Sequence, residues 1–357
     1  MNQPHLMLAD GATLLVLTGM AQLVVGNAII GLLEGILLAA IFKVPRKRAV
    51  WIMILANYVS MIAGLVGVKV AWAGLRPWLV GDEPLYHMTR LVLIPAALSF
   101  AVTLALEWPF CYWAMKGETR RFRRSVQGDL IVQTASYLLL VPVFFWASQI
   151  NLLTDFSTDR SLAARSPNDA TVFFVDGRDD ALYRIGADGS DRRKVADLPA
   201  DWMPKLVPDQ DFKWWDLQIE QRGQQRTLIP HLASDLFSRE DAELAGASVD
   251  PWHYGPAYDY RRPGERRWLL SHDHWSWISA SDSQTDRHVS IAMELPFEKW
   301  MASAVTMLPG ERAVFAMGDQ ILLADMNTRK VCMLVRGHWP IVVPNRCLVS
   351  DAATKPK

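Results

Sequence analysis

Four polar side chains occupy equivalent positions in the apolar N-terminal half of the chain. Glu34 and Glu107 each lie nine residues before a lysine, and Asn57 and Gln133 each lie nine residues after an arginine. At a rise of 1.5 Å per residue, each side chain lies about 13.5 Å along a helix from its flanking cation. We therefore predict one polar layer near the middle of an apolar core about 30 Å thick. Asn27 shares a helix face with Glu34 and extends this layer.

Two carboxyl groups in an apolar layer suggest chemistry with protons or cations. Like charges at one depth do not both ionise cheaply, so one group would be protonated or a cation would lie between them. The alternative is structural: protonated Glu34 and Glu107 would hydrogen-bond to Asn57 and Gln133 across helices. No histidine lies in the apolar stretches, which argues against a transition-metal or haem site there.

The elements that would position this layer are four apolar stretches, at residues 12–42, 49–70, 91–115 and 130–149. A helix of about 20 residues crosses a bilayer. We therefore predict that residues 1–150 form a transmembrane four-helix bundle. No basic segment with a cleavage site precedes the first stretch, so we expect it to be retained.

Basic residues gather in the connections after the first and third stretches. These nine are Lys43, Arg46, Lys47, Arg48, Lys116, Arg120, Arg121, Arg123 and Arg124, against three around the opposite connection, Lys69, Arg76 and Arg90. Because Lys and Arg mark the cytoplasmic side, we predict that both termini lie outside the cytoplasm. This pattern indicates a protein of the bacterial inner membrane, in contact with lipid, with its C-terminal half in the periplasm.

Composition separates the two halves of the 357-residue chain. Residues 1–150 hold 12 Lys/Arg and 7 Asp/Glu, and residues 151–357 hold 25 and 30, so the halves carry +5 and −5. Neither excess is typical of nucleic-acid binding. Ser, Asp and Pro predict a linker over residues 151–170. Alternating apolar residues and Asp-Gly turns predict an all-β domain over 171–350, before a polar tail at 351–357.

Two segments of this β domain share a strand–turn–strand pattern. They read "ALYRIGADGSDRRKV" at residues 181–195 and "VTMLPGERAVFAMGDQILLADMNTRKV" at residues 305–331. Both resemble the WD40-like repeats of TolB-type β-propellers, in which a strand ends at an Asp-Gly turn before the next strand. The resemblance implies a propeller-like domain that binds other proteins. Because the chain holds about four blades' worth of sequence, an open β sandwich is the alternative.

His272 and His274 are the candidate metal ligands of the β domain. In a strand they would lie on one face, and imidazole suits zinc or copper. The alternative is that they are surface or turn histidines in an aromatic region, since no cysteine and no third ligand stands at a fixed spacing from them.

Cys332 and Cys347 flank a strand–turn–strand pattern in the same domain. A hairpin would bring their thiols together, and the periplasm is an oxidising compartment. We therefore predict a disulfide between them. Cys111, in the third apolar stretch, is interpreted as a small packing residue.

No motif for nucleotide binding, nucleophilic catalysis or metalloprotease chemistry occurs, so no enzymatic activity and no cofactor are assigned. The leading hypothesis is a binding or scaffold subunit of a membrane complex, with other membrane or periplasmic proteins as partners. The alternative is a transporter-like protein that handles protons or ions through the carboxyl layer. A membrane-embedded enzyme that uses the same layer is a third hypothesis.

Overall fold

The chain divides into two compact units, each treated separately below. The computed structural model describes residues 5–147, 150–199, 202–221, 224–236, 258–261, 267–272, 278–294, 299–300 and 302–349. The helical unit comprises Met1–Leu79 and Arg90–Ala147, and the β unit comprises Val80–Thr89 and Ser148–Lys357. The connection between the second and third long helices therefore belongs to the β unit.

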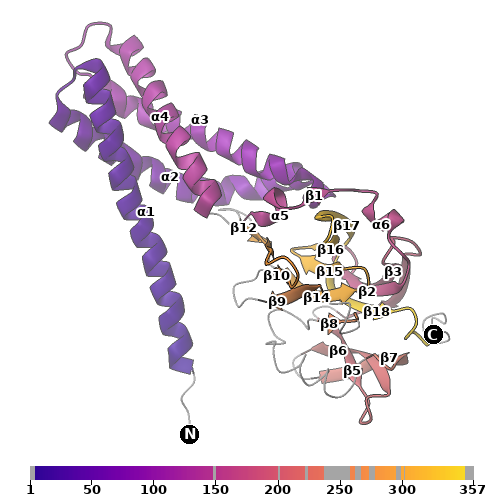
Figure 1. Cartoon of the computed structure of the whole chain (residues 1–357). Helices are drawn as coiled ribbons and strands as arrows, with labels where there is room; N and C mark the ends of the chain where they lie inside the picture. Colours follow the sequence, from indigo (N-terminus) through magenta and orange to yellow (C-terminus); the bar gives the residue numbers. More distant parts are fainter. Residues whose placement is uncertain are drawn as a thin grey trace. The chain divides into compact units, whose positions relative to one another are not determined.

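The helical unit contains four long helices (Figure 1). They are α1 (His5–Phe42), α2 (Arg46–Val80), α3 (Met88–Ala114) and α4 (Arg121–Ala147). Glycines bring the backbones of α1 and α2 together, because a Cβ atom on Gly31 would lie 2.6 Å from the Cα of Ile54. A Cβ atom on Gly35 would lie 2.4 Å from the Cα of Val50. Only glycine allows this approach.

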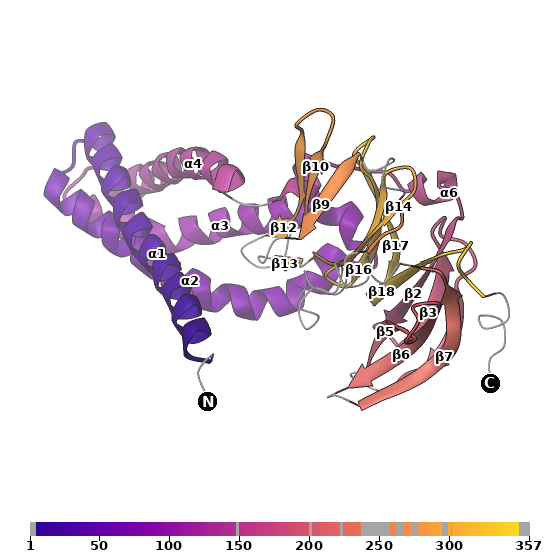
Figure 2. The ribbon, with the colours of Figure 1, turned by 60° about the horizontal axis from the view of Figure 1, so that its bottom comes forward.

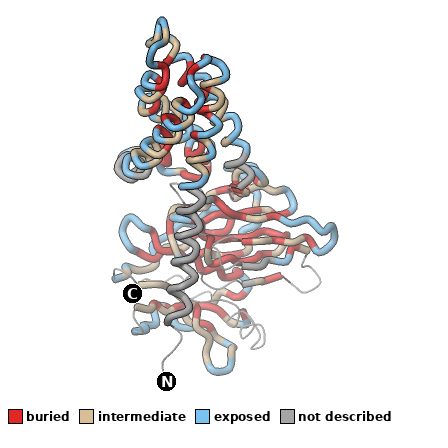
Figure 3. Tube along the Cα trace, turned by 90° about the vertical axis from the view of Figure 1, so that its left-hand side faces the viewer, coloured by how far each residue is buried: buried red, intermediate tan, exposed pale blue. Residues whose placement is uncertain are grey.

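Polar side chains lie inside the helical unit, and apolar side chains cover its outside. The buried polar residues are Glu34, Asn57, Glu107, Ser125, Asp129 and Gln133. Among the described residues, every exposed large apolar side chain lies on α1–α4, except Leu269 and Trp339 of the β unit. Figure 3 shows exposed positions recurring along these helices. An apolar cluster that includes Leu38, Met53 and Met115 is buried as well, so the unusual feature is the amount of apolar surface left exposed.

The predicted transmembrane four-helix bundle is wrong. Among the described residues, two helical segments have the length and apolar character to cross a membrane, Val24–Phe42 and Pro84–Ala114. Within the described residues, α2 and α4 contain no segment that combines this length and apolar character. The sequence-based assignment counted four spans from the length of the apolar stretches.

The described strands of the β unit form five sheets, whose strands are labelled in Figures 1 and 2. The six-stranded sheet has the order β1 (Ser157–Thr158), β17 (Lys330–Arg336), β16 (Gln320–Asp325), β15 (Arg312–Met317), β14 (Ala302–Leu308) and β8 (Tyr258–Asp259). The four-stranded sheet has the order β18 (His338–Pro344), β2 (Ala170–Asp176), β3 (Ala181–Gly186) and β4 (Arg193–Asp197).

The other sheets are smaller. One three-stranded sheet has the order β5 (Met203–Pro208), β6 (Trp214–Gln221) and β7 (Gln224–Ser234). The other three-stranded sheet has the order β11 (His288–Ile291), β10 (Ile278–Asp282) and β9 (Trp268–His272). The last pairs β12 (Met293–Glu294) with β13 (Lys299–Trp300). The pairs β1–β17 and β8–β14 are parallel, and the other described pairs are antiparallel.

One apolar core joins three of these sheets. Phe173 of β2, Leu217 of β6 and Val314 of β15 belong to the same buried cluster. Strand β18 brings the C-terminal part of the chain to β2, with Val342 opposite Val172. The described strands nevertheless form separate sheets, and no closed propeller is seen in them. The predicted propeller-like fold is wrong because turn signals specify hairpins and leave the arrangement of sheets open.

The connection Val80–Thr89 is fastened to the six-stranded sheet of the β unit. It contains the 3-10 helix η1 (Pro84–His87), in which Leu85 donates its backbone N–H to Gln320 Oε1 at 2.7 Å. Tyr86 accepts a hydrogen bond from the backbone N–H of Met333 at 3.3 Å. Leu85 and Gln320 are both fully buried. The connection is therefore part of the domain's interior.

The segment 151–170, interpreted from its composition as a linker, also carries structure. It holds α5 (Asn151–Thr154), β1 and α6 (Leu162–Arg165). Leu152 donates its backbone N–H to the Ala292 carbonyl at 3.0 Å, and Ser157 lies opposite Lys330 in the β1–β17 pair. These contacts fix the segment to two different sheets.

The predicted disulfide between Cys332 and Cys347 is wrong, since all three cysteines are free and buried. Cys332 lies on β17 opposite Leu323 of β16. Cys347 follows β18, and its thiol lies 3.9 Å from the carbonyl oxygen of Asp235. Because β17 and β18 join different sheets, the segment between the cysteines does not form a hairpin.

We expect three reactive thiols in the unfolded chain, because none of the three cysteines is bonded. Maleimide labelling in denaturant, followed by mass spectrometry, should give three adducts with or without a reductant. A single adduct that rises to three after reduction would contradict the structure. Blocking exposed thiols before lysis controls for bonds formed during purification.

Candidate functional site

Glu34 of α1 is hydrogen-bonded to two other helices in the interior of the helical unit. Its Oε2 accepts a hydrogen bond from Asn57 Nδ2 of α2 at 2.5 Å, and its Oε1 accepts one from Ser136 Oγ of α4 at 2.6 Å. Only 2% of Glu34 is exposed. Both carboxyl oxygens therefore have a donor in place of water.

Glu107 of α3 is held by the same two helices. Its Oε1 accepts a hydrogen bond from Ser60 Oγ of α2, and its Oε2 accepts one from Gln133 Nε2 of α4, both at 2.6 Å. Thus α2 and α4 each donate one hydrogen bond to each glutamate. The donors on each helix are three residues apart and share one face. We call the six residues Glu34, Asn57, Ser60, Glu107, Gln133 and Ser136 the carboxyl cluster.

The structure brings together four of the five residues of the predicted polar layer. The fifth residue, Asn27, donates its Nδ2 hydrogen to the sulfur of Met61 at 3.2 Å. Sequence reasoning missed Ser136 and did not identify Ser60 as a partner of Glu107. The signal for Ser136 was its position three residues after Gln133, on the same face of α4.

A third buried acid, Asp129, was also missed. It lies four residues before Gln133 on the inward face of α4, and the thiol of Cys111 is 3.6 Å from its Oδ1. One turn earlier, Ser125 accepts a hydrogen bond from Trp108 Nε1 at 3.1 Å. These residues continue the polar face of α4 from Ser136 to Ser125.

The carboxyl cluster contains acids without bases. Among the residues that the structure describes, no Lys, Arg or His forms an ion pair with Glu34, Glu107 or Asp129. Neutral donors satisfy each oxygen of the two glutamates, so a structural role requires nothing beyond these bonds. A role in proton or cation handling stays a prediction.

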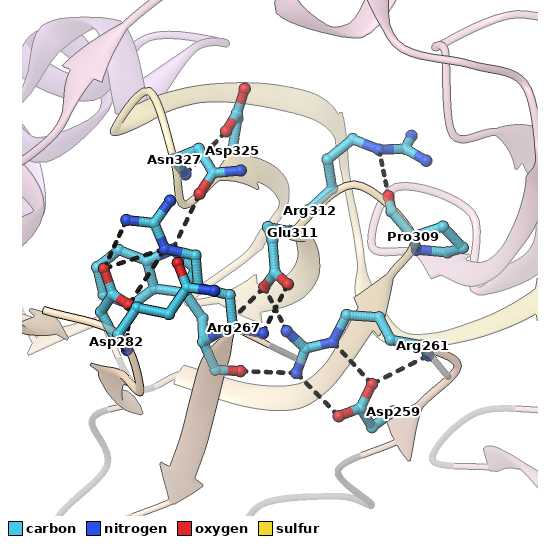
Figure 4. Close-up of polar contacts among 11 residues, drawn as sticks. Asp259, Arg261, Arg267, Asp282, Pro309, Glu311, Arg312, Asp325 and Asn327 are labelled. Carbon is cyan, nitrogen blue, oxygen red and sulfur yellow. Dashed lines mark hydrogen bonds and ion pairs between the residues drawn. The ribbon is translucent and has the colours of Figure 1, made fainter. Parts of the chain in front are cut away.

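A buried ion network in the β unit is centred on Arg261 (Figure 4). The guanidinium donates to both carboxylate oxygens of Asp259, at 2.9 and 2.8 Å, and to Glu311 Oε2. Glu311 also accepts the backbone N–H groups of Arg267 at 2.9 Å and Trp268 at 3.2 Å. Its φ of 60° is in the left-handed region, so these bonds hold an unfavourable backbone conformation.

Arg267 extends this network to Asp282 on β10. Its Nε and Nη2 lie 3.1 and 2.8 Å from Asp282 Oδ2. Asp282 is almost fully buried and also accepts hydrogen bonds from Thr285 Oγ1 and the backbone N–H of Gln284. The hydrogen bond from Arg267 is the main reason that the pKa of Asp282 lies well below its usual range. Since the charges of the network are paired, it is best explained as structural.

The predicted metal pair is only partly within the described residues. His272 is the last residue of β9 and lies opposite Ile278 of β10. The side chain of His272 and all of His274 lie outside the described residues. No group of three or more His, Cys, Asp or Glu that could hold a metal occurs within the described part of the chain. The metal site stays a prediction.

A cavity of about 470 Å³ lies between α6 and the turns that follow β14 and β16. Its lining includes Arg165, Arg312 and Lys330. Arg312 is paired with Asp169 at 2.5 Å, and the other two cations share Asp159. Because all three cations already have carboxylate partners, the cavity offers an anionic ligand little net attraction.

Comparisons with known proteins do not place the chain in a family. No family model and no curated protein matches it. Among solved structures, the crystal structure of a nidogen/laminin complex matches with 16% identity over 50% of this chain and a TM-score of 0.14. The match covers 65% of that other chain. A likeness at this TM-score carries no argument about fold or function.

We expect Glu34→Ala to destabilise the protein much more than Glu34→Gln. The alanine leaves Asn57 and Ser136 without their acceptor, at about 1–3 kcal/mol for each buried group. The glutamine keeps one acceptor oxygen. Thermal unfolding of the purified full-length protein measures the difference. Gln127→Ala, at an exposed position of α4, is the control. Equal unfolding temperatures for the two Glu34 variants would contradict the assigned bonds.

The Arg267–Asp282 pair should make stability depend on pH in the acid range. Because the pKa of Asp282 is lowered on folding, the pair stabilises the protein above the ordinary aspartate value of 3.8, and this contribution is lost as pH falls below it. Thermal unfolding at several pH values should show a constant difference between the wild type and Arg267→Gln above about pH 5, and a shrinking difference below pH 4. Arg287→Gln, at an exposed turn position, should give no such trend. A pH-independent difference would contradict this assignment.

Proposed function

We propose that the chain is an integral membrane protein, with Val24–Phe42 and Pro84–Ala114 as its candidate spans, and that its β unit is a binding or scaffold domain outside the cytoplasm. The observation that carries this proposal is the surface of the helical unit, which exposes many large apolar side chains while Glu34, Glu107 and Asp129 are buried beside an apolar cluster. In water this arrangement would leave a large apolar surface uncovered. In lipid the same surface needs no cover, and polar groups are best paired inside.

The basic connections support an orientation for the helical unit. Arg48 Nη2 donates to the carbonyl oxygen of Lys116 at 2.9 Å, and Arg124 Nη2 lies 3.3 Å from that of Phe42. The two basic connections therefore meet at one end of the unit, which the bias of Lys and Arg assigns to the cytoplasm. The connection Val80–Thr89 and the chain after Ala147 belong to the β unit. The same bias of Lys and Arg is what supports a periplasmic β unit in a protein of a bacterial inner membrane.

The β unit has features that suit a protein partner. Within the described residues, β9 and β18 are edge strands, and they carry the exposed apolar side chains Leu269 and Trp339. Edge strands present backbone groups that a partner strand can pair with, and exposed aromatic residues are common interface anchors. The paired charges of the Arg261 network favour a rigid support over a catalytic centre.

Membrane insertion and orientation can be tested with single cysteines, because the natural cysteines are buried. Ser190→Cys lies at an exposed turn of the β unit, and Thr119→Cys lies at an exposed position in a basic connection. A membrane-impermeant maleimide should label Ser190→Cys in intact spheroplasts and Thr119→Cys only after permeabilisation. The protein should also stay in the membrane pellet at alkaline pH and leave it in detergent. Release at alkaline pH would refute insertion, and reversed labelling would refute the orientation.

The scaffold role requires a partner that depends on the edge strands. Gentle purification of the tagged full-length protein from its native membrane should recover a stoichiometric protein partner. Leu269→Lys with Trp339→Ala should lose this partner without loss of folding, because both side chains are exposed. Lys213→Gln, at another exposed position of the β unit, should keep it. Purification of the wild type without any partner would count against the scaffold role.

A further inference from the structure

We propose that the cytoplasmic end of the helical unit is a binding site for anionic phospholipid headgroups; this inference rests on the proposed membrane insertion. The site, here called the basic end, consists of the nine cations Lys43, Arg46, Lys47, Arg48, Lys116, Arg120, Arg121, Arg123 and Arg124. Glu118 is the only acidic residue in the two connections that carry them. Nine cations and one carboxylate leave a net charge of +8.

Arg48 and Arg124 hold the two connections together as one surface, and Arg121 fixes the second connection to the end of α3. Arg48 donates to the carbonyl oxygen of Lys116, and Arg124 donates to Glu118 and lies 3.3 Å from the Phe42 carbonyl. Arg121 Nε donates to the Tyr112 carbonyl at 2.7 Å, with its guanidinium 3.7 Å from the centre of the Tyr112 ring. These contacts tie the α1–α2 turn to the α3–α4 turn. The surface is therefore built into the fold.

The other six cations are available for a ligand. The side chains of Lys43, Arg46, Lys47, Lys116, Arg120 and Arg123 are exposed, and none forms an ion pair within the described residues. Glu118 does not neutralise them, because it is paired with Arg124. In addition, the Nε of Arg48 is buried and has no hydrogen-bond partner among the described residues. A phosphate oxygen is an acceptor that suits all of these donors.

Exposed aromatic side chains place this surface at the level of lipid headgroups. Trp51 on α2 is 72% exposed, Trp113 on α3 is 52% exposed and Phe122 on α4 is 63% exposed. All three lie within a few residues of the basic connections. Aromatic residues are enriched at membrane–water interfaces. Cations beyond an aromatic rim favour a lipid with a net negative headgroup, such as a phosphatidylglycerol, over a zwitterionic lipid.

The test compares two lipids that differ in headgroup charge. Full-length protein in an uncharged detergent is incubated with equal amounts of dioleoylphosphatidylglycerol and dioleoylphosphatidylcholine, and bound lipids are counted by native mass spectrometry. The wild type should bind mainly phosphatidylglycerol. The variant with Lys47→Gln, Arg120→Gln and Arg123→Gln should lose this preference by about tenfold, because these side chains are exposed and unpaired.

A matched variant controls for net charge. Lys213→Gln, Arg226→Gln and Arg287→Gln remove three exposed charges from the β unit and should leave the preference unchanged. Equal binding of the two lipids by the wild type, or an equal loss in both triple variants, would overturn the proposal. Thermal unfolding should show both variants folded. Failure of membrane insertion is recognised separately, by release of the wild type from membranes at alkaline pH.

Discussion

The reciprocal hydrogen bonding of two buried carboxyl groups is the constraint on which the helical unit depends. Helices α2 and α4 each donate to both Glu34 and Glu107. A buried carboxyl oxygen without a donor costs more than the bond itself contributes, so the arrangement is stable only when all four bonds form together. A shift of α2 or α4 by one residue would rotate its donors by about 100° and break two bonds. The cluster therefore fixes the register of four helices.

This constraint also determines what the outside of the helical unit can be. The polar side chains of the carboxyl cluster are used in the interior, and many large apolar side chains are left on the outside. In the proposed lipid environment no hydrophobic force acts between helices, so their association relies on hydrogen bonds and close backbone contact. Gly31 and Gly35 provide that contact between α1 and α2. The β unit also has an apolar core, and its buried charges, such as Arg261, are paired with opposite charges. The two interiors thus differ in how their polar groups are satisfied: neutral donors bind the carboxyl groups of the helical unit, beside its own apolar cluster, and ion pairs satisfy the buried charges of the β unit.

The positions of Glu34, Asn57, Glu107 and Gln133 could be predicted because depth along a helix depends only on distance in sequence. Which donor meets which acid could not be predicted, since that depends on how the helices face one another. Ser60 and Ser136 therefore appeared as partners only in the structure. Asp129 was missed because it lies five residues from Arg124, within the basic flank of α4. The count of four spans was wrong because only two described segments combine the length and the apolar character of a span.

In the β unit, local sequence patterns predicted the turns but not the contacts between strands that are far apart in the sequence. The glycines in the turns after β3 and β15, Gly189 and Gly318, both have positive φ, as their turns require. Cys332 and Cys347 are close in sequence, yet they lie on and beside strands that join different sheets. Arg261 lies in a sequence rich in basic residues and proline. It is nevertheless buried, because its guanidinium is paired with Glu311, 50 positions later in the chain. A charged side chain is buried only when a partner of opposite charge lies close to it in space. The neighbouring sequence does not show which residue that partner is.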